Sequence, residues 1–208
     1  PLMRNHSAKG TREQEFYRFG HVEDFRGIIG LRYALVPYLY SEFVKAAMRD
    51  DMMFLPLAFV YPKDQEAAVV EDQLMVGESV MIAPVYRQNA RGRYVYLPED
   101  MKLYRFRSSE DVDIEVHHYV KAELNEVLVF VRPNHVVPLA GGGCCVADVD
   151  MSRLRLLHFV TDQAEYELYD DDGYGKKIDL ESGITKVRVT ADGKVDAEGA
   201  LEAEWTLL

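Results

Sequence analysis

The stretch Pro1-Leu2-Met3-Arg4-Asn5-His6-Ser7-Ala8 changes from apolar to polar within a few residues. An apolar opening that runs straight into Arg-Asn-His is typical of the C-terminal end of a barrel strand, where side chains face a ligand. Residues 9–14, which follow, are mostly small or polar. A solvated terminal tail has a similar composition, so the sequence downstream has to decide between the two interpretations.

Residues 22–49 predict a helix. Pro37 lies inside it and predicts a kink or a break between two helices. Arg32 falls on the apolar stripe, where a charge is paired or reaches solvent, so we expect a structural ion pair rather than catalysis. The apolar residues that follow the 3.6-residue period are Phe25, Ile28, Ile29, Leu35, Val36, Leu39, Phe43 and Ala46.

The next segments, together with this helix, predict an incomplete α/β unit. Residues 53–61 are nearly all apolar, and a helix followed by such a run indicates a strand that is buried on both faces. Residues 65–76 predict a short helix that stops at Gly77. Residues 79–85 predict another apolar strand.

After Arg87 the pattern changes. Residues 93–97 alternate, and further short segments follow at short spacing with turn residues between them, which is typical of β-sandwiches. Gly141-Gly142-Gly143 is the best linker candidate and divides these segments into two β-domains. The predicted fold class is therefore α/β plus all-β. The predicted strands are residues 93–97, 103–106, 113–117, 122–124, 126–132, 154–161, 165–169, 185–190 and 200–207.

The composition of the 208 residues is that of a globular protein, with 48% hydrophobic residues and a net charge of -11. The negative charge argues against nucleic acid as a partner, and no apolar run is long enough for a membrane span. The sequence lacks a signal-peptide pattern and begins at Pro1 in what resembles mid-strand, so we expect a C-terminal piece of a longer protein. Adjacent Cys144 and Cys145 indicate thiols in a reducing compartment, and we expect a cytoplasmic location.

Two acidic clusters are candidate sites. Glu71 and Asp72 would point about 100° apart on a helix, so they cannot flank one bond, and we expect a cap or an ion pair. Residues 170–175 resemble part of a calcium loop with Glu181 in the twelfth position, although Tyr174 stands where an oxygen ligand is needed. A tight turn rich in Asp and Gly explains the same residues.

The histidines give no metal site. His117 and His118 are neighbours on a predicted strand and point to opposite faces. His21, His135 and His158 are isolated, and we expect each to be a surface or hydrogen-bonded side chain. We predict no metal ligands and no cofactor, and these residues alone name no substrate.

A series of motifs follows the chain in order between Met3 and Gly173, and together they resemble glycoside hydrolase family 31, the α-glucosidase family. Each motif is weak alone, but their order and spacing are specific. Phe16, Leu55 and residues 102–106 depart from the family pattern, which affects the expected substrate preference. The motifs are Met3-Arg4-Asn5-His6, residues 12–19, residues 31–40 (LRYALVPYLY), residues 55–57, residues 72–85 (DQLMVGESVMIAPV), residues 93–98, residues 131–138 and residues 169–173.

The resemblance implies the terminal part of a (β/α)8 TIM barrel followed by two β-sandwich domains. Residues 1–77 would be the end of the catalytic barrel, residues 78–143 the proximal β-sandwich and residues 144–208 the distal one. Family members retain the anomeric configuration and use an Asp nucleophile and an Asp acid/base on earlier barrel strands. We therefore expect no catalytic residue in this chain, which alone should be inactive.

By the same resemblance, His6 would hydrogen-bond the sugar next to the scissile bond and Arg4 would support it. The expected function is that of the C-terminal part of a retaining α-glucosidase acting on terminal α-linked glucose of oligosaccharides, without a cofactor. An α-xylosidase is the alternative within the family. The expected partners are the α-linked glucoside substrate and the N-terminal part of the same enzyme.

A non-catalytic β-sandwich module that binds carbohydrate or stabilises a neighbour is the rival from another class. Such a surface would need exposed aromatic side chains. Tyr94, Tyr96, Tyr104 and Tyr119 are available, although core packing and cross-strand pairing explain them as well. A third alternative is a complete chain whose missing barrel strands come from a hetero-complex.

Overall fold

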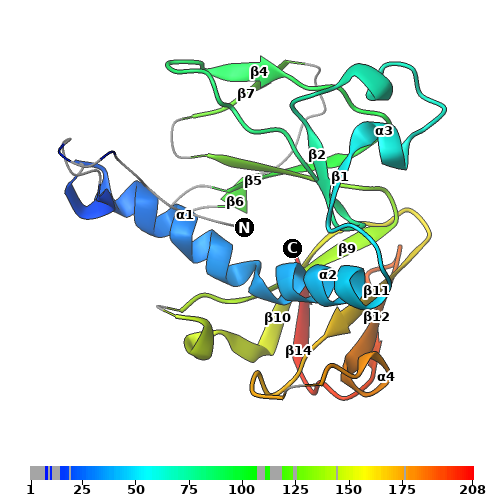
Figure 1. The fold of residues 1–208 in the computed structure, drawn as a ribbon. Coiled ribbons are helices and arrows are strands. Elements are labelled where there is room, and N and C mark those ends of the chain that lie inside the picture. The colour runs from blue at the N-terminus through cyan, green and yellow to red at the C-terminus, as the bar shows by residue number, and fades with distance from the viewer. Residues whose placement is uncertain are drawn as a thin grey trace.

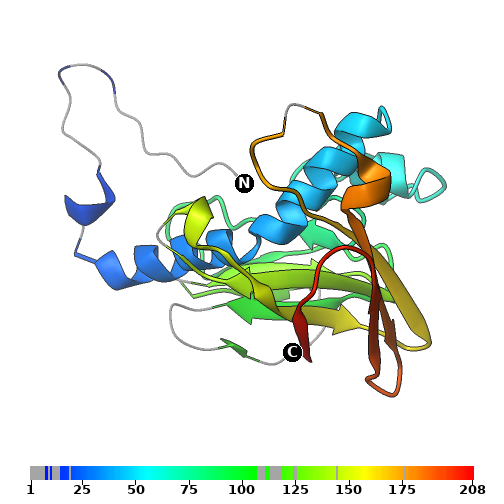
Figure 2. The ribbon, with the colours of Figure 1, turned by 90° about the horizontal axis from the view of Figure 1, so that it is seen from below.

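The computed structural model describes residues 8, 10, 15–18, 20–106, 111–112, 119–123, 126–143, 145–175 and 177–208. After a short 3-10 turn, η1 (Phe16–Arg18), two helices run almost end to end across one side of the strands (Figure 1). Figure 2 shows these helices lying over the β-structure, with most strands on one side of them. The molecule is thus mostly β-sheet with few helices.

The two helices are α1 (Val22–Ala34) and α2 (Val36–Met48), which meet at Leu35. Pro37 lies in the first turn of α2, where its missing N–H group would have no helical partner in any case. The predicted break is therefore confirmed. Along α1, all of which is described, only Ala34 is buried, whereas six of the 13 residues of α2 are buried, and α2 contacts β9 (His135–Gly141) and β11 (Gln163–Tyr169).

Two predictions for the segment after α2 were wrong. Residues 53–61 form only the short strand β1 (Phe54–Pro56), which is not buried on both faces, and then the helical turn α3 (Leu57–Val60). The helix predicted over residues 65–76 is instead the 3-10 turn η2 (Ala67–Val69) followed by strand β2 (Leu74–Val76). Antiparallel pairing of β2 with both β1 and β3 overrides the local pattern here.

The main sheet has the strand order β1-β2-β3-β8-β5-β6, and every pairing in it is antiparallel. The strands predicted over residues 79–85, 103–106 and 126–132 are confirmed as members of it. Its remaining strands are β3 (Val80–Ile82), β5 (Lys102–Phe106), β6 (Asp111–Val112) and β8 (Val127–Val131).

Strand β4 (Gly92–Tyr94) pairs with β7 (Tyr119–Lys121) apart from the main sheet. The strand predicted over residues 122–124 is therefore displaced toward the N-terminus. The strand predicted over residues 113–117 lies outside the described residues.

Side chains along a strand of the main sheet point alternately to its two faces, which explains why the sheet has a core on each face. On β8, Val129 and Val131 point to a cluster shared with the helices and C-terminal strands, whereas Leu128 and Phe130 point to a cluster around Leu57. Successive side chains of a strand face opposite sides, so the main sheet is covered on both.

The C-terminal strands form two further sheets, with orders β14-β10-β9 and β11-β12-β13. Of the six strands that the structure describes in these two sheets, β10, β11, β12 and β14 were predicted, and β9 and β13 were not. The elements are β9 (His135–Gly141), η3 (Val146–Asp148), β10 (Asp150–Phe159), β11 (Gln163–Tyr169), α4 (Leu180–Gly183), β12 (Ile184–Thr190), β13 (Val195–Glu198) and β14 (Glu204–Leu207).

Strands β9 and β10 pair antiparallel on either side of the glycine stretch, with Gly141 opposite Asp150 and His135 opposite Phe159. One hydrophobic cluster also joins Tyr38 of α2 to Val131 of β8 and to Leu156 of β10. The division into residues 1–77, 78–143 and 144–208 stays a prediction.

Candidate functional site

The sequence-predicted site residues His6 and Arg4 lie outside the described residues, as do residues 11–14 of the loop that follows them. Their contact with a sugar stays a prediction. The described chain continues from this region through η1 into α1, so α1 is the regular element that connects it to the sheets.

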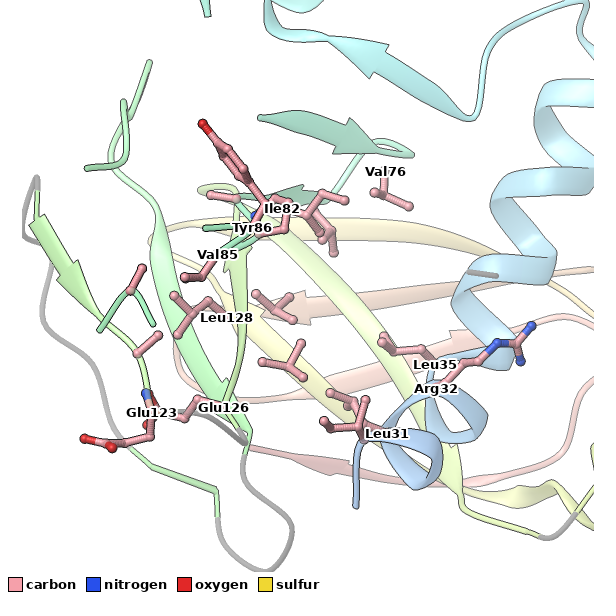
Figure 3. A pocket seen from close by; sticks show the side chains of 18 of the residues that line it. Leu31, Arg32, Leu35, Val76, Ile82, Val85, Tyr86, Glu123, Glu126 and Leu128 are labelled. Carbon is pink, nitrogen blue, oxygen red and sulfur yellow. The ribbon is translucent and has the colours of Figure 1, made fainter. Parts of the chain in front are cut away.

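A cavity of about 800 Å³ lies between the junction of α1 and α2 and the main sheet (Figure 3). Leu31 and Leu35 of the helical side face Val76 and Ile82 of the sheet across it. Such a predominantly aliphatic lining favours apolar groups over sugar hydroxyls.

Two charged residues at the edge of this cavity, Glu126 and Arg32, lie against other side chains. Glu126 is buried and accepts hydrogen bonds from Arg105 Nη1 at 3.2 Å and from the backbone N–H of Glu123 at 3.0 Å. The guanidinium of Arg32 points away from the cavity in Figure 3 and lies 6.0 Å from the ring centroid of Tyr33. The ion pair expected for Arg32 stays a prediction.

A second hollow, of about 350 Å³, is polar and aromatic. We call it the tyrosine hollow and define it by Asp72, Tyr86, Arg93, Tyr94 and Tyr119. Arg93 Nη2 lies 2.6 Å from Asp72 Oδ1, which confirms the ion pair expected for this carboxylate. Burial by itself would raise the pKa of Asp72, but the hydrogen bond and charge of Arg93 lower it below its usual value.

Gly92 is required for the strand pairing beside the tyrosine hollow. Its φ is +148°, and a Cβ on it would overlap the backbone carbonyl of Val120 on β7. Only glycine therefore allows β4 and β7 to approach closely enough for Tyr94 to lie opposite Tyr119.

A buried charged cluster fixes α2 to the sheets. The carboxylate of Glu42 lies 2.6 Å from Lys45 Nζ and accepts hydrogen bonds from Tyr166 OH at 2.8 Å and from the N–H of Glu78 at 3.0 Å. Lys45 Nζ also lies 3.0 Å from Glu78 Oε1. We call Glu42, Lys45, Glu78 and Tyr166 the Glu42 cluster. Its polar groups satisfy one another, so its role is structural.

The aspartate segment of residues 170–175 forms the turn that the sequence allows. Asp171 Oδ2 accepts hydrogen bonds from Tyr40 OH at 2.7 Å and from Tyr169 OH at 3.0 Å. Asp172 Oδ1 accepts from the N–H groups of Tyr174 and Gly175, both at 2.9 Å. Within the described ranges, no group of three or more His, Cys, Asp or Glu side chains could hold a metal ion.

Two isolated histidines behave as expected. His21 Nδ1 lies 3.4 Å from Asp24, and His135 Nδ1 lies 2.8 Å from the carbonyl of Pro133. His158 differs, because its Nδ1 is buried and has no hydrogen-bond partner among the residues that the structure describes. Burial lowers the pKa of His158 and so favours the neutral ring. His117 and His118 lie outside the described residues.

Two family models match successive parts of the chain. The "Glycosyl hydrolases family 31 TIM-barrel domain" matches residues 1–42, and the "Glycosyl hydrolase family 31 C-terminal domain" matches residues 50–137. The chain belongs to glycosyl hydrolase family 31. The family resemblance noted in the sequence is thereby confirmed.

Family 31 relatives resemble the chain in sequence and in structure. "Alpha-glucosidase 2" of Bacillus thermoamyloliquefaciens is 28% identical over 220 residues, which cover 100% of this chain and 27% of that protein. A Flavobacterium johnsoniae family 31 dextranase, solved with glucose, superimposes with a TM-score of 0.70 at 26% identity, over 85% of this chain and 22% of its own. The family 31 α-xylosidase of Xanthomonas citri gives a TM-score of 0.62 at 25% identity, over 85% of this chain and 19% of its own.

The chain therefore spans about a quarter of the length of these family 31 proteins. None of the helices in the described part of the chain is long and apolar enough to cross a membrane. Sequence reasoning named Tyr94 and Tyr119 as available aromatic residues but did not bring them together with Asp72 and Arg93 in one hollow. It missed the Glu42 cluster, which depends on partners far apart in the chain.

Proposed function

We propose that the chain is the C-terminal part of a retaining α-glucosidase that releases terminal α-linked glucose from oligosaccharides. The observation that carries the proposal is the similarity to an α-glucosidase along the whole chain. A retaining glycosidase needs two carboxyl groups about 5–5.5 Å apart. In this proposal both belong to the part of the same enzyme that lies outside these 208 residues.

The chain contributes substrate contacts rather than the reacting carboxylates. His6 donates a hydrogen bond to the sugar next to the scissile bond, and Arg4 positions it. A hydrogen bond that strengthens as charge develops on the sugar lowers the barrier to bond cleavage. No cofactor takes part in this reaction.

The rest of the chain supports the barrel. Most residues of α1 are only partly buried, and the aliphatic cavity beside Leu31 and Leu35 continues that accessible surface. A barrel helix packs its apolar side on the strands inside it. The partly buried residues of α1 support packing against the remaining barrel, with α2 anchored by the Glu42 cluster.

The test compares this chain with the longer enzyme that contains it, using an aryl α-glucoside. The chain alone should show no turnover above background. In the longer enzyme, His6→Ala should lower kcat/KM by about 100-fold, because one lost transition-state hydrogen bond costs about 3 kcal/mol. The matched control His21→Ala, at an exposed histidine, should retain full activity. Unchanged kcat/KM for His6→Ala would refute the assignment of His6.

An α-xylosidase is the second candidate, supported by the similarity to the Xanthomonas citri enzyme. An aryl α-xyloside assayed in parallel distinguishes the two. A higher kcat/KM on the xyloside than on the glucoside would mean that the enzyme releases xylose rather than glucose.

We also propose that the enzyme works in the cytoplasm. The support is Cys145, which is a free and exposed thiol, because such thiols persist in a reducing compartment. Recovery of the native protein in an extracellular fraction would contradict this location.

A further inference from the structure

The tyrosine hollow exposes aromatic rings that do not belong to the core. Tyr94 is 75% exposed, Tyr86 is 62% exposed and Tyr119 is 43% exposed. Neighbouring exposed aromatic side chains mark interaction surfaces more often than isolated ones do. Tyr96 and Tyr104 differ, because their hydroxyl groups donate to Asp64 and to the carbonyl of His158 within the fold.

The rings of the hollow are held in place by the strands beneath them. Tyr94 and Tyr119 lie opposite each other in the β4–β7 register, with ring centroids 5.1 Å apart and an interplanar angle of 71°. This edge-to-face arrangement fixes both side chains and leaves ring surface open to solvent. Little conformational entropy would then be lost when a ligand binds.

The polar floor of the hollow is built around a buried arginine. The side chain of Arg93 is 10% exposed and donates to Asp72 Oδ1 at 2.6 Å. It also donates to the carbonyls of Asp72, Pro84 and Tyr94, each at 3.0 Å. The hydroxyl of Tyr86 donates to Asp72 Oδ2 at 3.2 Å.

The Arg93–Asp72 floor of the hollow carries no net charge, whereas Arg87 at its wall adds one positive charge. Because Arg93 and Asp72 neutralise each other, the pair offers hydrogen-bonding groups without a net charge. A neutral ligand with several hydroxyl groups and an apolar ring face matches such a surface. The volume of about 350 Å³ lies within the range of ~300–1,000 Å³ that is usual for small-molecule sites.

We propose that the tyrosine hollow is a non-catalytic binding site for a glucopyranose unit of an oligosaccharide. One ring face of the sugar stacks on Tyr94 or Tyr119, and its hydroxyl groups bond to Asp72 and Arg93. The site holds a chain of sugar units on the β-sheet part of the enzyme. The choice of an α-linked ligand rests on the proposed function, whereas the sugar site itself rests on the hollow.

Isothermal titration of the 208-residue chain with maltotriose tests the site, with cellotriose as the β-linked comparison. Maltotriose should bind, and Tyr94→Ala should weaken binding by about tenfold, as expected for one lost stacking contact. Tyr94 is largely exposed, so its removal should leave the fold intact, which circular dichroism checks. The matched control is Tyr174→Ala, at a tyrosine 92% exposed on the aspartate turn, and it should bind like the unchanged chain.

The outcomes separate the two proposals. Binding of neither sugar, or equal binding by the Tyr94→Ala and unchanged chains, overturns the sugar site and leaves the hydrolase proposal intact. Binding of cellotriose alone, lost in Tyr94→Ala, supports the site and counts against an α-linked substrate. Equal weakening by Tyr174→Ala overturns the assignment to the hollow.

Discussion

Removal of the carboxylate of Glu42 should destabilise the fold more than any single change at an exposed ion pair. Glu42 is 6% exposed, and its carboxylate is the shared partner of Lys45, Tyr166 and the N–H of Glu78. In Glu42→Ala the ammonium group of Lys45, 7% exposed, keeps within this cluster the contact with Glu78 and a cation–π contact with the ring of Tyr166, 4.3 Å from its centroid. The hydroxyl of Tyr166 loses its acceptor.

The magnitude follows from these contacts. Breaking a buried ion pair by removing one partner costs about 3–5 kcal/mol, because a buried charge loses its closest partner. We therefore expect the free energy of unfolding to fall by about 3–5 kcal/mol, a large part of the ~5–15 kcal/mol of a typical domain. The double variant Glu42→Leu/Lys45→Met removes both charges and should recover much of this loss.

Urea unfolding followed by the fluorescence of Trp205, the single tryptophan, measures these values. The control is Glu23→Ala, which removes an exposed i,i+3 pair with Arg26 and should cost less than about 1 kcal/mol. The reasoning fails if Glu42→Ala and Glu23→Ala destabilise the chain equally. It also fails if the double variant is no more stable than Glu42→Ala.

Two other predictions follow from single positions. Gly92→Ala should lower the melting temperature, because the Cβ of the new alanine would overlap the backbone of Val120. It should also weaken the contacts between the rings of Tyr94 and Tyr119 in nuclear Overhauser spectra. Retained ring contacts would contradict this prediction. Burial and the hydrogen bond to Asp171 raise the pKa of Tyr40 to about 12. Folding therefore opposes deprotonation of Tyr40. The contribution of the protonated hydroxyl to stability should be present below pH ~10 and lost as the pH rises toward ~12. Urea midpoints across this range should decline less steeply in Tyr40→Phe, and an identical decline would contradict the assignment.

The elements that the sequence predicted correctly depend on local chemistry. Pro37 separates α1 from α2 because proline lacks a backbone donor, whatever surrounds it. The apolar run within residues 126–132 forms β8, because each face of the main sheet has its own core. Such features need no knowledge of distant partners.

The missed elements depend on pairing between distant segments. Met75 and Val76 lie in the helix predicted over residues 65–76, but pairing with β3 makes them a strand. Strand β9 was missed although residues 135–141 form it, since Pro138 argues against a strand. The strand lies at the edge of its sheet in the order β14-β10-β9, where proline is tolerated.

The candidate sites show the same limit. Tyr94 and Tyr119 could be singled out as aromatic residues, but their partnership requires the register of β4 and β7. The pair of Glu42 and Lys45 is visible as an i,i+3 spacing, yet its burial comes from Tyr166, 124 residues away. Sequence patterns identify such residues but do not show which of them contact one another.

The central claim is that this chain is part of a retaining α-glucosidase. The most direct test is to follow the anomer of glucose first released from an aryl α-glucoside by the longer enzyme, using proton magnetic resonance to separate the anomers. Retention through a covalent intermediate predicts that α-glucose is released first and then mutarotates. Initial release of β-glucose, or no release of glucose from the aryl α-glucoside, would contradict the account.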